Sequence, residues 1–151
     1  MLERLKRKNS GADKPYIYLE NNLDGVYESV RDIIDENPTD NIGILSEHML
    51  HVDIFAEELS DDYEVSKYRN QDIIPSELKN IIITTFKSAK GIEFDIVIIP
   101  YFPNGAKNRA EEYYVGATRA KNQVYFLAIH DIPKIMSHFK KDSYELVDNR
   151  D

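Results

Sequence analysis

Cysteine does not occur anywhere in the 151 residues of this chain. Its absence excludes disulfide bonds, thiolate zinc sites and a cysteine nucleophile, and it fits a reducing compartment. No apolar run approaches the roughly 18–20 residues that cross a bilayer. The first residues, MLERLKRKNSG, are basic and lack the apolar core of a signal peptide. We therefore expect a soluble, cytoplasmic protein with no membrane contact.

The chain also has fewer positive than negative residues: it contains 19 basic and 27 acidic residues, and its net charge is −8. This balance argues against a general nucleic-acid coat, since the phosphate backbone favours a positive surface. The stretch from Thr84 to Tyr125 is an exception, with six basic and four acidic residues. Any anion site is therefore expected in the C-terminal half. The pattern G-x-x-x-x-G-K-S/T does not occur, so the chain has no P-loop.

The order of the expected elements indicates an α/β fold. The length suits one domain, and 42% hydrophobic with 30% charged residues is an ordinary globular balance. Strands are expected over 15–20, 41–46, 63–68, 81–86, 96–100, 124–128 and 144–147, and helices over 24–36, 47–59, 110–120 and 132–139. The strand IVIIP is apolar throughout, as in a parallel sheet covered on both faces. Residues 1–14 are expected to form a tail or severed linker, and 15–151 a doubly wound domain.

The segment TFKSAKGIEFD, Thr85 to Asp95, gathers small, basic and hydroxyl residues between two strands. Glycine at such a turn, here Gly91, lets the backbone approach an anion closely, and free amides there favour phosphate. The acidic Glu93 suits a sugar hydroxyl better than a phosphate. Contacts to phosphate oxygens are available from Thr85, Lys87, Ser88 and Lys90. On spacing alone, however, such a segment is more often a plain surface loop.

A second segment, EEYYVGATRAKNQVYFLA, predicts a helix followed by a buried strand. It places Arg119 near the carboxyl edge of the sheet or just before the next strand. A guanidinium held there can reach a phosphoryl group in a neighbouring domain, as arginine fingers do. The alternative is a salt bridge from Arg119 to Glu111 or Glu112.

Together the two segments resemble the UvrD/Rep-like superfamily 1 DNA helicases. TFKSAKGIEFD resembles motif V of that family, T-x-H-S-A-K-G-L-E-F, and YVGATRAKNQVYFLA resembles motif VI, Y-V-A-x-T-R-A followed by a strand. Residues 41–60 are similar to a strand and helix of the second motor domain, and the resemblance covers about 15–147. It implies a RecA-like, three-layer domain with a mostly parallel central sheet. In that family this domain closes over ATP and moves along single-stranded DNA.

The resemblance implies nucleotide-binding roles for particular residues. Arg119 matches the motif VI arginine that reaches the γ-phosphate, and it is the expected catalytic residue. Glu93 matches the glutamate that hydrogen-bonds the ribose, and Gly91 gives the close backbone approach beside it. In the family, ATP and Mg²⁺ are held mainly by an N-terminal RecA-like domain, which carries the P-loop. This chain alone is therefore expected to hold no cofactor and to hydrolyse no ATP.

The implied partners are single-stranded or partly duplex DNA and the N-terminal RecA-like domain of the same protein. Thr85 and Ser88 match positions that face the DNA backbone. Lys87 replaces the usual histidine and can still contact phosphate. Lys90 matches the motif lysine, and its role is either to bind DNA or to stabilise the structure. A different hypothesis is a non-enzymatic helicase-like module that has lost its motor partner and binds protein or DNA passively.

Two histidines have a spacing that can bind metal. His48 and His51 lie three residues apart on an expected helix, but no further ligand motif accompanies them. We expect a solvated helix face there and no metal site.

Overall fold

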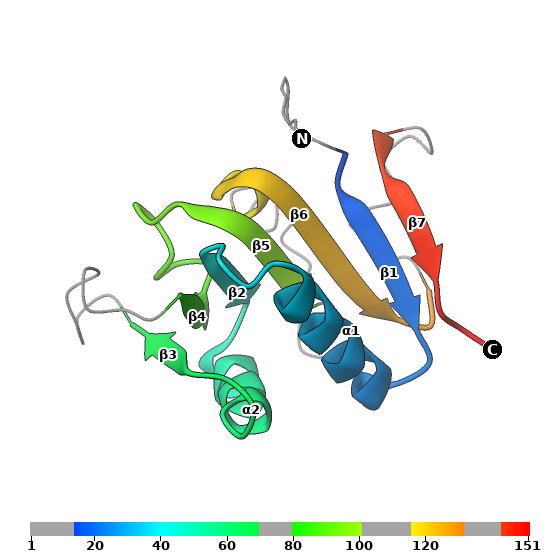
Figure 1. Ribbon diagram of the computed structural model, residues 1–151, viewed down its shortest axis with the longest axis horizontal. Helices are drawn as coiled ribbons and strands as arrows, with labels where there is room; N and C mark the ends of the chain where they lie inside the picture. The colour runs from blue at the N-terminus through cyan, green and yellow to red at the C-terminus, as the bar shows by residue number, and fades with distance from the viewer. Residues whose placement is uncertain (1–13, 70–79, 101–115, 132–142) are drawn as a thin grey trace.

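The computed structural model describes residues 14–69, 80–100, 116–131 and 143–151. These residues form a seven-stranded sheet in the order β3-β4-β2-β5-β6-β1-β7, in which every neighbouring pair is parallel (Figure 1). The strands are β1 (Tyr16–Glu20), β2 (Ile42–Ser46), β3 (Val65–Tyr68), β4 (Ile81–Thr85), β5 (Phe94–Pro100), β6 (Ala120–Ile129) and β7 (Glu145–Asp148). The described helices are α1 (Leu23–Glu36) and α2 (Met49–Leu59). The expected α/β fold with a parallel sheet is confirmed.

Helix α1 is closed at both ends by asparagine side chains. The Asn22 side chain accepts a hydrogen bond from the Gly25 N–H at 2.9 Å, which satisfies one free amide of the first turn. At the other end, the side-chain amide of Asn37 donates to the Ile33 carbonyl at 2.8 Å, and Pro38 follows. Between these ends the buried residues recur at helical spacing: Val26, Tyr27, Ser29, Val30, Ile33 and Ile34.

Both described helices pack on the same face of the sheet (Figure 1). The fully buried Phe55 of α2 meets Tyr27 of α1 edge to face, with ring centroids 5.2 Å apart. At the rim of this contact, the Arg31 guanidinium forms ion pairs with Glu58 at 2.6 Å and Asp62 at 3.1 Å. The helices are thus held together by apolar packing with a partly exposed ion pair at its edge. No helix within the described ranges is long and apolar enough to cross a membrane.

The opposite face of the sheet has its own buried cluster. Alternate strand residues supply most of it, and the turns after β4 supply Phe86 and Ala89. Phe94, at the start of β5, is fully buried in this cluster. The turns between β4 and β5 therefore act as a covering layer as well as a connection.

Strand β6 differs most from its expected extent. The apolar run predicts a strand over 124–128, whereas β6 has 10 residues, Ala120–Ile129. Ala120, expected in a helix, pairs with Phe94, so β5 also begins before its apolar run. Both strands extend because main-chain pairing does not require apolar side chains. Residues 1–13, 110–115 and 132–139 of the expected tail and helices lie outside the described residues.

Gly43 in β2 lies directly under the Phe94 ring. A Cβ atom at position 43 would lie 2.7 Å from the nearest ring carbon, Cδ2, which is too close for any side chain. Glycine thus allows the Phe94 ring to lie against the neighbouring strand.

We expect Gly43→Ala to lower the free energy of unfolding by about 1–3 kcal/mol, because a methyl group forced into a packed core displaces its neighbours. Urea unfolding followed by circular dichroism measures this loss. Phe94→Leu makes room for the methyl group, so the double variant should lose less than the sum of the two single losses. Additive losses would contradict this contact.

Candidate functional site

The segment between β4 and β5 runs from the side of the sheet at which the strands end, here called the carboxyl edge, to the side at which they begin, the amino edge. Thr85, at the end of β4, is in register with Ser46, the last residue of β2. Ile96 of β5 is in register with Ile42, the first residue of β2. Since β2 has 5 residues, these two levels are about 13 Å apart at a rise of about 3.3 Å per residue. The beginning and the end of this motif segment therefore lie on opposite edges.

The expected DNA-binding residues begin at the carboxyl edge. The Thr85 hydroxyl accepts a hydrogen bond from the Ser88 N–H at 3.1 Å, and the Thr85 carbonyl accepts one from the Ala89 N–H at 3.0 Å. These turns leave Lys87 exposed and enclose Ser88, which is 7% exposed. Lys90 is exposed further along the segment. The two lysines are thus accessible to a ligand, whereas Ser88 is largely enclosed.

The expected nucleotide-binding residues meet at the amino edge. The Phe94 N–H donates to the Arg119 carbonyl at 2.8 Å, so the residues that precede β5 and β6 are neighbours. Of the two positions that the sequence allows for Arg119, the structure has the one just before the next strand. Glu93 beside it is exposed, and Arg119 is half-buried. The main chain therefore places Glu93 and Arg119 before two neighbouring strands at the same edge of the sheet.

The Arg119 guanidinium is only partly satisfied by the described residues. Its Nε is buried and has no hydrogen-bond partner among them. Its Nη2 donates to the Thr118 hydroxyl at 3.4 Å, which is long for such a bond. The alternative partners Glu111 and Glu112 lie outside the described residues. Within the described part of the chain, the guanidinium keeps donor capacity for a ligand.

A tight contact joins the two motif segments. A Cβ atom at Gly116 would lie 2.6 Å from Cδ1 of Phe86, so the Phe86 ring occupies the space of the missing side chain. The Arg119 N–H in turn donates to the Gly116 carbonyl at 3.1 Å. Phe86 follows Thr85 directly, so one aromatic ring links the carboxyl-edge turns to the turn that carries Arg119. Sequence reasoning missed this pair, since nothing in the motifs shows which apolar residue meets which glycine.

Ser46 is a second residue that sequence reasoning missed. Its hydroxyl is buried at the end of β2, beside Thr85 in register, and it has no hydrogen-bond partner among the described residues. The available signal was a single polar residue closing an apolar strand.

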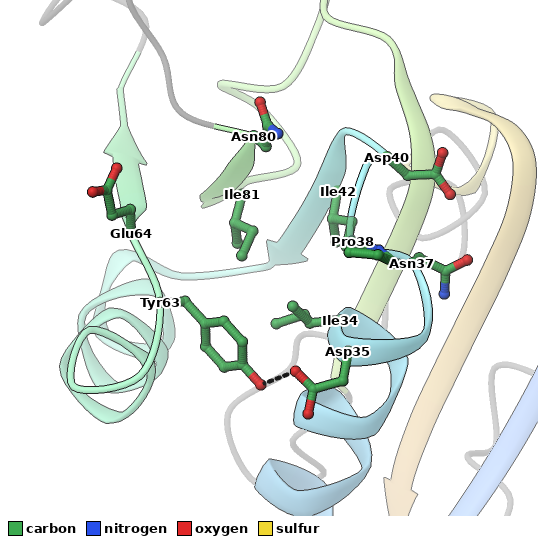
Figure 2. Close-up of a pocket in the computed structure, with 10 residues that line it drawn as sticks. All are labelled: Ile34, Asp35, Asn37, Pro38, Asp40, Ile42, Tyr63, Glu64, Asn80 and Ile81. Carbon is green, nitrogen blue, oxygen red and sulfur yellow. Dashed lines mark hydrogen bonds between the residues drawn. The ribbon is translucent and has the colours of Figure 1, made fainter.

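A pocket of about 510 Å³ lies between the end of α1 and the starts of β2 and β4 (Figure 2). Its acidic side chains are Asp35, Asp40 and Glu64. The Tyr63 hydroxyl donates to Asp35 at 2.7 Å, and burial together with this bond raises the pKa of Tyr63 to about 12. Burial and the nearby charge of Asp95 raise the pKa of Asp40 above its usual range. No sequence pattern indicates this pocket, because separate segments supply its walls.

The histidine pair does not form the solvated face expected from the sequence. His51 is buried in α2, and His48 is the residue that precedes the helix. Burial, followed by the neighbouring His48, lowers the pKa of His51. The expectation of a solvated face was therefore wrong for His51, because this position lies on the buried side of α2. Within the described ranges, no group of three or more histidine and acidic residues is placed to hold a metal ion.

Comparison with known proteins gives a family and a relative. The family described as UvrD-like helicase C-terminal domain matches residues 2–131 of the chain. The RecB subunit of the RecBCD enzyme from Chlamydia pneumoniae is 34% identical over 84 residues. This match covers 51% of the chain and 7% of that protein, so the chain spans only a small part of this relative.

Solved structures share the fold. The C-terminal domain of a possible DNA helicase from Lactobacillus plantarum has a TM-score of 0.78 at 18% identity, covering 91% of this chain and 88% of that one. The C-terminal domain of the DEAD-box protein Dbp5 has a TM-score of 0.66 at 15% identity, covering 93% and 92%. At these identities the likeness concerns the fold alone, which is that of a RecA-like helicase domain.

Gly91, in the turns that connect the two edges, has a left-handed backbone conformation whose cost can be measured by substitution. Its φ is +85°, and a Cβ atom there would meet nothing within 4 Å. We expect Gly91→Ala to lower the free energy of unfolding by about 1–2 kcal/mol, because the left-handed conformation strains an L side chain. Gly91→Asn should cost less, since asparagine tolerates that conformation better. Thermal or urea unfolding of the two variants provides the test, and equal losses would contradict a purely conformational cost.

Proposed function

The chain belongs to the family of UvrD-like helicase C-terminal domains, and on this basis we propose that it is the second RecA-like motor domain of an ATP-dependent DNA helicase. In this role it supplies an arginine finger, a ribose contact and part of a track for single-stranded DNA. The observation that carries the proposal is the buried Nε of Arg119, which has no partner among the described residues and lies at the start of the strand next to the one that Glu93 precedes.

Arg119 suits the role of the finger for a physical reason. A buried N–H group without a partner costs about 1–3 kcal/mol, and a phosphate oxygen would satisfy it. The guanidinium is planar, always charged and able to bind two phosphate oxygens at once. When ATP is bound between two domains, it supplies the phosphoryl group. The role proposed for Arg119 is to donate hydrogen bonds to the negative charge that develops on that group.

Glu93 and Gly91 suit a nucleoside rather than a phosphate. A carboxylate accepts hydrogen bonds from ribose hydroxyls, and its charge repels phosphate. Gly91 leaves open space where another residue would place a side chain, so a ligand can approach the main chain. The cradle for the β-phosphate and Mg²⁺ must come from a companion domain, because this sequence contains no P-loop pattern.

The proposed DNA track begins at the opposite edge. Lys87 and Lys90 are exposed there, and the main-chain turns around Thr85 fix the position of Lys87. The net charge of −8 means that this domain alone should bind DNA weakly and in a salt-dependent way. In a complete motor, a second domain would supply the rest of the track.

A second candidate is a helicase-like module that binds partners without turning over ATP. The excess of acidic residues and an acidic pocket favour a protein-binding role of this kind. The two hypotheses differ in what Arg119 does, so this residue provides the sharpest test.

We expect Arg119→Ala, in the protein that joins this domain to its P-loop domain, to reduce DNA-stimulated ATP turnover by at least about a hundredfold. Arginine fingers are worth on the order of 10³–10⁵ in other phosphoryl-transfer enzymes. Arg119→Lys should restore little activity, because an ammonium group cannot reproduce the planar fork. Steady-state ATPase assays measure the effect.

The matched control is Arg150→Ala, which removes an arginine that pairs with Asp148 and donates to the His130 carbonyl. Thermal unfolding should show that both variants fold, with a change of roughly 0.5 kcal/mol or less for Arg119→Ala and a larger one for Arg150→Ala, which should nevertheless keep its ATP turnover. Near-normal turnover in a well-folded Arg119→Ala protein would reject the finger and favour the non-enzymatic module.

For DNA, we expect Lys87→Ala to weaken binding of single-stranded oligonucleotides without any sequence preference. Loss of one phosphate contact should reduce the log–log salt slope by about 0.7. Fluorescence anisotropy at several salt concentrations measures both effects. Lys121→Ala removes the same charge near the amino edge, where β6 begins, and should change binding less. Equal effects of the two variants would place the track elsewhere.

A further inference from the structure

The turn that carries Arg119 is held by its main chain on two sides. The Arg119 N–H donates to the Gly116 carbonyl at 3.1 Å, and the Arg119 carbonyl accepts a hydrogen bond from the Phe94 N–H at 2.8 Å. The guanidinium itself is held less firmly, because its Nε has no partner among the described residues and its bond to the Thr118 hydroxyl is 3.4 Å long. Within the described part of the chain, the place of the guanidinium therefore follows the place of the turn.

Phe86 fixes the Gly116 side of this turn. Two ring carbons, Cδ1 and Cε1, lie only 2.6 Å and 2.7 Å from the place that a Cβ atom at Gly116 would take. The ring is almost completely buried, at 3% exposure, and belongs to the cluster on the face of the sheet opposite α1 and α2. The Phe86 N–H also donates to the Ser46 carbonyl at 3.0 Å, so the residue is tied to the end of β2. The ring thus lies between the sheet and the turn, and its volume sets the distance between them.

We propose that Phe86 is a positioning residue for Arg119, which it holds in place for a nucleotide bound between the two motor domains. This inference rests on the proposed function, in which Arg119 is the arginine finger. A smaller side chain at position 86 would leave room for the turn to shift, and a shift of about 1 Å in a catalytic group can cost about a hundredfold in rate. In this proposal Phe86 itself contacts no nucleotide and acts through Arg119 alone.

The kinetic effect of Phe86 should fall on turnover rather than on ATP binding. The finger acts on charge that develops during phosphoryl transfer, whereas the P-loop of the companion domain holds the phosphates before that step. Loss of an interaction made only in the transition state lowers kcat and leaves the KM for ATP unchanged. A residue that only fills the core would instead lower the amount of folded protein, and the molecules that remain folded would keep their kcat.

The test measures DNA-stimulated ATP turnover of Phe86→Leu in the protein that joins this domain to its P-loop domain, at a temperature where thermal unfolding shows the variant to be folded. We expect kcat to fall about tenfold and the KM for ATP to change less than about twofold. The matched control is Phe55→Leu, which makes the same change at a fully buried ring in the cluster on the other face. It should lower the thermal midpoint and keep kcat within about twofold.

The decisive comparison adds Phe86→Leu to Arg119→Ala. If Phe86 acts only through Arg119, the double variant should turn over ATP no more slowly than Arg119→Ala alone, because the group that Phe86 positions is already gone. The same further loss in that background, a normal kcat in folded Phe86→Leu, or an equal loss in Phe55→Leu would overturn the positioning role and leave the finger intact. Near-normal turnover in folded Arg119→Ala would instead reject the proposed function.

Gly116→Ala provides a second variant if Phe86→Leu does not fold. Its methyl group would meet the Phe86 ring from the other side and displace the same turn, so kcat should again fall while the KM for ATP is kept. This effect should likewise vanish in the Arg119→Ala background. A normal kcat in the folded Gly116→Ala protein would overturn the proposal.

Discussion

The register in which β5 pairs with β2 on one side and β6 on the other is the constraint on which the candidate site depends. Asp95 fixes this register at the amino edge, because its N–H donates to the Asn41 carbonyl at 2.9 Å and its side chain accepts the Asn41 N–H at 2.8 Å. A slip of one residue would turn every side chain of β5 to the opposite face. Phe94 would leave its place over Gly43, and Glu93 would no longer precede the strand beside Arg119.

A parallel sheet forces each connection to travel from the carboxyl edge back to the amino edge. Between β4 and β5 this return takes only a few turns, and these turns are packed into the second core through Phe86 and Ala89. The proposed DNA contacts and the proposed nucleotide contacts are thus the two ends of one short connection. The two ends are joined in space through the main chain and through the ring that lies against Gly116.

The sequence predicted the elements well, because β-branched runs and helical spacing are local signals. It did not predict where β6 begins, since residues 120–123 are held by pairing with β5 and carry no apolar pattern. The motif resemblance named Arg119 and Glu93, and the structure added that the main chain of Arg119 is hydrogen-bonded to Phe94, the residue after Glu93. The acidic pocket and the burial of His51 were invisible in the sequence, because both arise where separate segments meet.

The two aromatic–glycine contacts have a consequence for how this domain can diverge. The Phe94 ring fills the space above Gly43, and the Phe86 ring fills the space beside Gly116. In each pair the aromatic ring occupies the space that a side chain at the glycine position would need. A methyl group gained at either glycine must therefore be matched by a smaller side chain on its partner. Positions 43 and 94, and positions 86 and 116, are thus expected to covary, although each pair is far apart in the sequence.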